Sequence, residues 1–107
     1  MKHLQILAAE DCAACKKFLK KVPELENVLS QRGLVGEINV YHKKSIYDSR
    51  PEGWSAQLPN IFFPVIALQS GNEWHVYNGN YNATTSKWSP NRKSLDANTI
   101  ADWIKNK

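Results

Sequence analysis

Apolar residues in the first third of the chain follow two different patterns. A short apolar run at residues 3–8 is long enough for a buried strand but too short for a helix. From Cys12 onward, apolar residues recur at steps of four, three and four, which places them on one face of a helix. These residues are Phe18, Val22, Leu25 and Leu29. Pro23 lies inside this stripe, where it either kinks one helix or opens a second helix that ends near Gly33.

Two later segments carry strand patterns. Residues 34–41 alternate polar and apolar side chains, which predicts a second strand with one face more covered than the other. Residues 65–68 form an apolar run, and a turn at residues 70–72 leads into residues 74–77, which predicts a hairpin. Pro64 can stand only at the beginning of the strand that follows it, because proline cannot donate a ladder hydrogen bond.

The remaining stretches are mostly polar. Residues 42–60 are weakly patterned and predict at most a short helix before Pro59. Residues 79–94 predict a long polar loop. A last helix follows, with Ser94 as candidate N-cap and Asp96 in the first turn. Its inward-facing residues are Ile100, Trp103 and Ile104.

The predicted order of elements is βαβαββα, an α/β fold. Parallel neighbours need a crossover connection and antiparallel neighbours need only a turn, so this order suits a four-stranded mixed sheet with helices on both faces. With 107 residues, the chain fits a single domain that spans residues 1–107.

Composition narrows the class of protein. Apolar residues make up 42% and charged residues 22%, and no apolar run approaches the ~18 residues of a membrane helix, so we expect a soluble protein without a membrane partner. A solvated helix face explains the lysines at residues 16–21, which contribute much of the net charge of +4. Aromatic and basic residues are not interleaved, so we expect no nucleic-acid partner. The first residues carry no export signal, so we expect a cytoplasmic protein.

Cys12 and Cys15 carry the clearest chemical signal. They are separated by two residues and stand where the first strand ends and the first helix begins. Unpaired N–H groups and the positive end of the helix dipole stabilise a thiolate on Cys12. Cys15, one turn further, would lie close enough to attack a mixed disulfide formed by Cys12. The pattern predicts a redox-active dithiol in which Cys12 is the nucleophile and Cys15 the resolving cysteine.

Two other interpretations of the pair stay open. The cysteines could be inert residues buried in a helix, or they could form half of a zinc site. The zinc interpretation is weaker because His3, His42 and His75 are scattered and provide no second ligand pair at a typical spacing. We therefore expect no metal.

The chain also resembles a known family. The succession of a strand, Cys12-Ala13-Ala14-Cys15, a helix, the segment 63–68 and a hairpin resembles the thioredoxin superfamily over nearly the whole chain. The resemblance implies a minimal thioredoxin-like fold, a cis peptide bond between Phe63 and Pro64, and contact between Phe63 and substrate backbone. The antiparallel strand after the turn runs back toward the cysteines, so Gly79 joins Phe63 and Pro64 as a candidate substrate-binding residue.

The resemblance implies a thiol-disulfide oxidoreductase that acts on protein substrates as a monomer. Its electron donor would be a reductase or glutathione, and its only redox group would be the Cys12–Cys15 disulfide, without a bound cofactor. This chain has Asp11 where thioredoxins place a tryptophan, and it has no histidine between the cysteines as disulfide isomerases do. With Glu10 adding negative charge, these differences favour a reducing potential.

Two alternative functions stay open. One is a glutathione-dependent, glutaredoxin-like reductase, although the glutathione-binding residues of that family have no match here and Glu10 and Asp11 should repel the anionic tripeptide. The other is a redox-inert thioredoxin-like binding module.

Two hypotheses concern residues away from the pair. Thioredoxins bury an acid on the cysteine strand where this chain has Ile6, so Glu37 on the neighbouring strand is a candidate proton shuttle, against the alternative of a solvated glutamate. The loop 79–94 begins near the cysteines and carries Tyr81, Lys87, Trp88 and Arg92. We hypothesise that it borders the substrate groove, with a disordered surface loop as the alternative.

Overall fold

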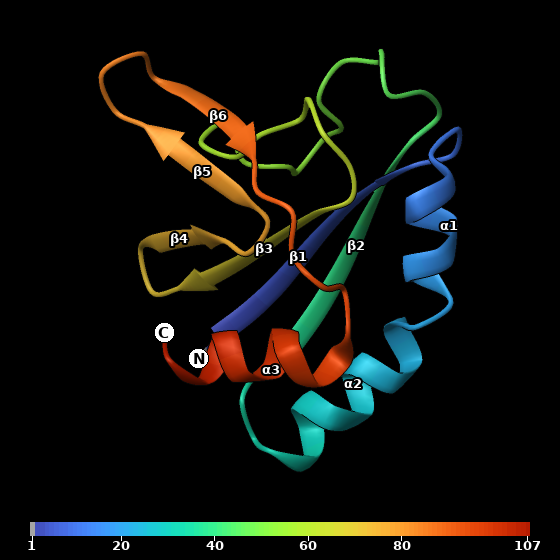
Figure 1. Ribbon diagram of the computed structural model, residues 1–107, viewed down its shortest axis with the longest axis vertical. Coiled ribbons are helices and arrows are strands. Elements are labelled where there is room, and N and C mark those ends of the chain that lie inside the picture. Colours follow the sequence, from blue (N-terminus) through green and yellow to red (C-terminus); the bar gives the residue numbers. More distant parts are fainter. Residues whose placement is uncertain (1) are drawn as a thin grey trace.

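The computed structural model describes residues 2–107, which build a four-stranded mixed sheet with helices packed against it (Figure 1). The sheet order is β2-β1-β3-β4, in which β1 runs parallel to β2 and antiparallel to β3, and β4 runs antiparallel to β3. The elements are β1 (Lys2–Ala9), α1 (Ala13–Leu19), α2 (Val22–Gln31), β2 (Glu37–Lys43), β3 (Val65–Ser70), β4 (Glu73–Val76), β5 (Gly79–Asn82), β6 (Lys87–Pro90) and α3 (Ala97–Lys105). The predicted α/β class and mixed sheet are confirmed.

Strand β1 lies inside the sheet and is buried on both faces. Residues 4–9 are all buried. Leu4 and Ile6 belong to one hydrophobic core, and Leu7 belongs to a second core on the opposite face. A strand that is covered on both faces needs apolar side chains on both, which explains the short continuous apolar run at residues 3–8 of the sequence.

The apolar stripe after Cys12 forms two helices. Pro23 stands in the first turn of α2, where the missing N–H removes no helix hydrogen bond. Helix α2 ends at Gln31, and Gly33 follows with a φ of 63°, a left-handed conformation that glycine adopts without steric cost. The break at residues 20–21 leaves α1 as a separate short helix directly after Cys12.

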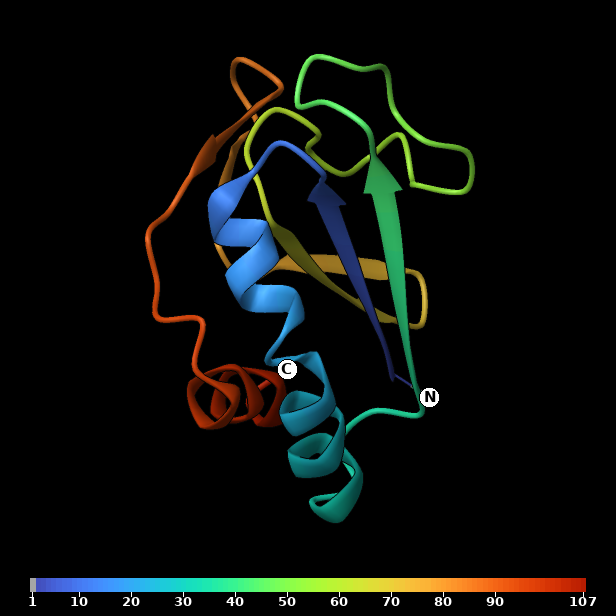
Figure 2. The ribbon, with the colours of Figure 1, turned by 90° about the vertical axis from the view of Figure 1, so that its right-hand side faces the viewer.

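Helices α1, α2 and α3 cover the same face of the sheet (Figure 2). Phe18 of α1, Leu25 of α2 and Ile100 of α3 share one core with Ile66 of β3. The prediction that helices cover both faces is therefore wrong. The connection from β2 to β3, which would have supplied a helix for the second face, contains none.

Residues 44–64 cover the second face as an irregular segment without helix or strand. Trp54 and Leu58 are buried and pack on the sheet side chains of this face. Trp54 Nε1 donates to the Pro59 carbonyl at 2.9 Å, and Arg50 donates to the carbonyl of Leu58 at 2.7 Å. The short helix predicted before Pro59 does not form. Side-chain donors satisfy the backbone carbonyls of this segment instead. The buried side chains of Trp54 and Leu58 provide the apolar contacts with the sheet that one face of a helix would have made.

Residues 79–94, predicted as a loop, contain a second hairpin of β5 and β6. Tyr81 and Trp88 are cross-strand partners whose ring centroids lie 5.1 Å apart. Trp88 Nε1 donates to the Gln57 carbonyl at 3.0 Å, which ties the hairpin to residues 44–64. Most hairpin residues are exposed, so the sequence carries no alternation of polar and apolar positions that would predict these strands.

The start of α3 differs from the prediction by two residues. Asp96 caps the helix, since its Oδ2 accepts from the backbone N–H groups of Asn98 at 3.1 Å and Thr99 at 3.2 Å. Ser94 lies before the helix and its Oγ accepts from the Asp96 N–H at 3.3 Å. A carboxylate that accepts two helix N–H groups makes Asp96 the better cap.

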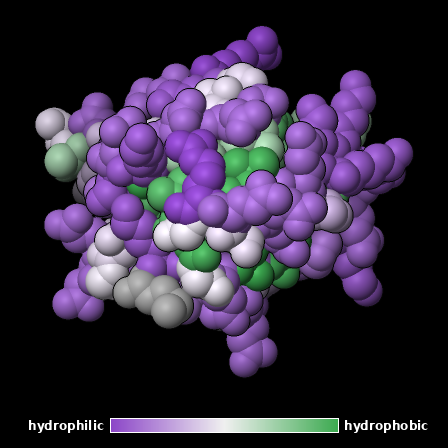
Figure 3. Space-filling view, turned by 90° about the horizontal axis from the view of Figure 1, so that it is seen from below, coloured by the Kyte–Doolittle hydropathy of each residue, from purple (hydrophilic) through white to green (hydrophobic). Residues whose placement is uncertain are grey.

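The beginning of β1 and the last turn of α3 meet at the end of the molecule opposite the start of α1 (Figure 1). Lys2 Nζ donates to the Ile104 carbonyl at 3.3 Å. Seen from this end, the surface is mostly hydrophilic, with hydrophobic side chains visible between the polar ones (Figure 3). Among residues 2–107, no helix has the length and apolar character that a membrane span requires.

Candidate functional site

Cys12 lies at the N-cap of α1, at the carboxyl end of β1. Its backbone is extended, with φ −107° and ψ 111°, and its Sγ accepts a hydrogen bond from the Cys15 backbone N–H at 3.1 Å. The side chain is partly exposed. Cys12 Sγ is therefore accessible at the start of a helix and hydrogen-bonded to the backbone of the second cysteine.

Cys15 is completely buried one turn further into α1. Burial raises the pKa of its thiol from 9.0 to about 12, and a hydrogen bond with the Cys12 side chain and the negative charges of Cys12 and Asp11 act in the same direction. A backbone hydrogen bond from Ala9 acts in the opposite direction. The two predicted catalytic residues are thus close together but chemically different: one thiol is accessible, and the other is buried and held neutral.

Asp11 connects the loop before Cys12 with residues 44–64. Its carboxylate accepts from the Ser45 hydroxyl and from the Ile46 backbone N–H, both at 3.0 Å. These bonds attach the irregular segment to the loop before Cys12. They also occupy both oxygens of the carboxylate that the sequence places directly before the nucleophile.

The peptide bond between Phe63 and Pro64 is cis, as predicted. Phe63 is half-buried, and neither its backbone N–H nor its carbonyl has a hydrogen-bond partner among the described residues. The Asn78 side chain holds the next residue, because its Nδ2 donates to the Pro64 carbonyl at 2.5 Å and its Oδ1 accepts from the Ile66 N–H at 3.1 Å. This role of Asn78 was not predicted from the sequence, where a single asparagine after a strand carries no special signal.

Phe63 and Pro64 line a hollow of about 390 Å³ together with Ala14, which lies between the two cysteines in the sequence. Asn78, Arg92 and Lys93 line its other walls. Neither cysteine lines this hollow, and we call it the cysteine groove because Ala14 places it next to the pair. The segment from β6 to α3 therefore lies beside the predicted site, which agrees in position with the hypothesis that residues 79–94 border it.

Gly79, the third predicted substrate-binding residue, has a different place. It is the first residue of β5 and does not line the cysteine groove. A Cβ atom at this position would lie 2.7 Å from Phe62 Cζ and 3.0 Å from Val76 Cγ1. Gly79 is therefore a packing residue that lets Phe62 lie against the base of the hairpin.

Lys43 is a site neighbour that sequence reasoning missed. It ends β2 and is buried, and its Nζ lies 4.9 Å from the centroid of the Phe63 ring and 3.3 Å from the Ile46 carbonyl oxygen, to which it donates. A cation over an aromatic ring is attracted by the ring quadrupole. Lys43 thus helps to fix the side chain of Phe63 beside the cysteine groove.

Glu37 lies at the wrong end of the sheet for a proton shuttle. It begins β2 opposite His3 and is exposed, and its Oε2 lies 3.1 Å from His3 Nδ1. Parallel strands start at the same end, so Glu37 is about 20 Å along the sheet from the end where Cys12 follows β1, at 3.3 Å per residue. This separation contradicts the shuttle hypothesis and favours the alternative of a solvated glutamate.

In comparisons with known proteins, no family model, no curated protein and no solved structure matches the chain. Among residues 2–107, no group of three or more His, Cys, Asp or Glu side chains is placed to hold a metal ion. The thioredoxin resemblance stays a prediction whose support is the site itself.

Proposed function

We propose that the protein is a thioredoxin-like thiol-disulfide oxidoreductase in which Cys12 attacks and Cys15 resolves. The observation that carries the proposal is the difference between the two thiols. Cys12 is partly exposed and accepts the Cys15 N–H at 3.1 Å, whereas Cys15 is buried with its pKa raised to about 12. A dithiol enzyme needs this difference between its thiols, because the accessible thiolate must react with the substrate first. The second thiol must react only after the mixed disulfide has formed.

The chemistry proceeds in two exchanges. The Cys12 thiolate attacks one sulfur of a substrate disulfide, forms a mixed disulfide and releases the other sulfur as a thiolate, which takes up a proton. Cys15 then loses its proton and attacks Cys12 Sγ, which forms the Cys12–Cys15 disulfide and releases the second substrate thiol. The substrate gains two electrons and two protons, the protein dithiol loses them, and an external thiol donor must reduce the protein again.

Phe63 supports a polypeptide as the substrate. Its N–H and carbonyl lack partners among the described residues, and Phe63 is one of the residues that line the cysteine groove. A backbone that is left unpaired at such a place can bond an extended peptide as a strand would. The cis-proline at the start of β3, next to a cysteine pair that follows a parallel β1, fits the thioredoxin-like fold that the resemblance implies.

Glutathione as the electron donor is a second candidate that one observation favours. Arg92 and Lys93 line the cysteine groove, whereas Asp11 does not line it and both of its carboxylate oxygens accept hydrogen bonds from residues 45 and 46. An anionic tripeptide is therefore less repelled than the sequence around Cys12 predicts. Reduction by glutathione at a rate comparable with that of a dithiol donor would assign the protein to the glutathione-dependent class.

The reduction potential of the Cys12–Cys15 pair tests the proposal. The protein is equilibrated with glutathione buffers of varied ratio, and its free thiols are counted. We expect one reversible two-electron transition on the reducing side, because no histidine stands between the cysteines to stabilise the thiolate further. If no buffer ratio forms the pair reversibly, the dithiol mechanism is wrong and a redox-inert binding module takes its place.

Thiol labelling at neutral pH separates the same two functions more cheaply. We expect iodoacetamide to modify Cys12 and to leave Cys15 unmodified, since Cys15 is buried and neutral. Equal labelling of the two cysteines, or no labelling of either, would contradict the assignment of their roles.

A further inference from the structure

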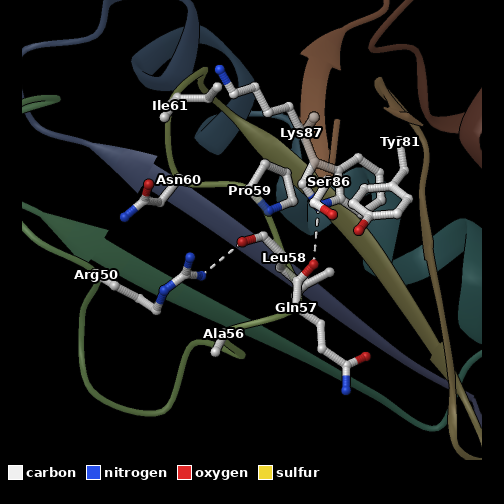
Figure 4. Close-up of a pocket in the computed structure, with 11 residues that line it drawn as sticks. Arg50, Ala56, Gln57, Leu58, Pro59, Asn60, Ile61, Tyr81, Ser86 and Lys87 are labelled. Atoms are coloured by element: carbon white, nitrogen blue, oxygen red, sulfur yellow. Dashed lines mark hydrogen bonds between the residues drawn. The ribbon is translucent and has the colours of Figure 1, made fainter. Parts of the chain in front are cut away.

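A second hollow, of about 550 Å³, lies between residues 56–61 and the β5–β6 hairpin (Figure 4). Tyr81 and Trp88 form its hairpin wall, and Ile61 stands at its rim with 68% of its surface exposed. Tyr81 is also 52% exposed. In Figure 4 the Lys87 side chain extends across the hollow toward Ile61. We call this the hairpin groove.

The hairpin groove and the cysteine groove lie along the same two stretches of chain. Residues 59–61 on one wall of the hairpin groove lead directly into residues 62–64, which line the cysteine groove. On the other wall, residues 86–88 lead through β6 into residues 90–93. The two hollows therefore lie along the same two chain segments, and an extended polypeptide bound in the cysteine groove can follow these segments to the hairpin groove.

The charged residues that line the two grooves all carry the same sign. They are Arg50, Lys87, Arg92 and Lys93, and no carboxylate lines either groove among the described residues. Arg50 is held by the Ser55 and Leu58 carbonyls, and Lys93 lies 5.2 Å from the Tyr77 ring centroid. Lys87 and Arg92, one in each groove, form no side-chain hydrogen bond or ion pair with residues 2–107. These two cations are free to bind an anionic partner.

We propose that the disulfide substrates of this protein carry an acidic segment next to their disulfide, and that this segment lies along both grooves. The inference rests on the proposed function and adds to it the class of substrate. Lys87 and Arg92 would contact carboxylates, and the Tyr81–Trp88 pair with Ile61 would contact one apolar side chain between them. Charge complementarity of this kind acts mainly on the rate of encounter and on the choice of partner.

The test uses three synthetic peptides that differ only in charge. Each contains one disulfide followed by six residues, in which one phenylalanine is flanked by glutamates, glutamines or lysines. Reduced protein is mixed with each peptide, and the second-order rate of thiol release is measured. We expect the glutamate peptide to react about tenfold faster than the glutamine peptide at low salt, and most of the difference to vanish in concentrated salt.

Two double variants locate the effect. Lys87→Glu with Arg92→Glu reverses the free charges of the grooves, and Lys20→Glu with Lys105→Glu makes the same change in net charge at exposed positions elsewhere, in α1's C-cap and α3's last turn. We expect the first variant to lose the preference for the glutamate peptide and the second to retain it. Bis(2-hydroxyethyl) disulfide, which is small and neutral, gives the basal rate of each protein, and each peptide rate is divided by it before the proteins are compared.

The outcomes separate the two proposals. If the small disulfide is reduced and the three peptides react at equal rates, the acidic-substrate inference is wrong and the proposed function stands. The same follows if Lys87→Glu with Arg92→Glu keeps the preference, or if the control variant loses it. If neither the small disulfide nor any peptide is reduced, the proposed function fails and this inference fails with it.

Discussion

Polar groups at the two ends of the central sheet differ in whether they have hydrogen-bond or ion-pair partners within the protein. At the end where Cys12 follows β1, the backbone of Phe63 and the guanidinium of Arg92 have no partner among the described residues. At the opposite end, Glu37 contacts His3 at 3.1 Å and Arg32 donates to Asp102 at 3.0 Å. Hydrogen bonds that the protein does not make with itself are available to a ligand. The difference supports the proposal that a ligand binds at the cysteine end, while the ion pairs at the opposite end join elements of the fold.

The sharpest test of this difference exchanges one atom at each end. Cys12→Ser should reduce disulfide reduction to the background rate, because a hydroxyl is not ionised at neutral pH and does not attack a disulfide. Glu37→Gln is the matched change at the opposite end, and we expect it to leave the rate and its pH dependence unchanged. Thiol release from a small disulfide measures both. A loss of activity in Glu37→Gln would restore that residue to the mechanism despite its distance.

Cys15→Ser should stop the reaction half-way. The attack by Cys12 still proceeds, but nothing resolves the mixed disulfide, so turnover falls to the rate at which external thiol releases the substrate. Mass spectrometry should detect protein joined to one substrate thiol through Cys12. Cys12→Ser serves as control, since its buried Cys15 should trap no substrate. Efficient turnover by Cys15→Ser would assign the protein to a mechanism that needs one cysteine.

Because the pKa of Cys15 is raised in the folded protein, the stability of the reduced protein should depend on pH. Below pH 9 the thiol is neutral in both the folded and the unfolded protein. Between pH 9 and about 12 only the unfolded chain ionises, so the reduced protein should lose stability as the pH rises through this range, by a few kcal/mol in total. Urea unfolding of Cys15→Ala at the same pH values is the comparison, and its curve should fall less steeply. Tyr77, whose pKa is also raised by burial, is present in both proteins and cancels.

The smallest effect is expected at the opposite end. Arg32 and Asp102 form an exposed ion pair between the end of α2 and α3. Asp102→Asn should lower the free energy of unfolding by less than about 1 kcal/mol, because solvent and salt screen such pairs. Disulfide reduction should not change. A larger loss of stability, or any loss of activity, would show that the two ends are not independent.

Periodic patterns predicted the parts of the fold that pack as regular surfaces. The apolar run of β1, the β3–β4 hairpin and the stripe through Phe18 and Leu25 all follow a period of strand or helix, and their place in the fold agrees. The site at Cys12 and Cys15 could be located because both residues are close in sequence and stand at a junction between elements. The cis bond before Pro64 came from family resemblance alone.

Features that depend on contacts between distant segments could not be predicted in the same way. Residues 44–64 cover the sheet through two inserted side chains, Trp54 and Leu58, which have no period. Arg92 reaches the cysteine groove only because the hairpin before it leads back across the molecule. The position of Glu37, however, could have been predicted from the sequence. Parallel strands start at the same end of a sheet, and Glu37 is the first residue of β2.

The contact between Lys2 and Ile104 has a practical consequence. It brings the first strand and the last helix together at the end of the molecule remote from Cys12. A surface, a resin or a fused protein attached through residues beside either of these elements would therefore lie at the end of the molecule that is remote from Cys12. Immobilised in this way, the protein would present Cys12 and both grooves to solution.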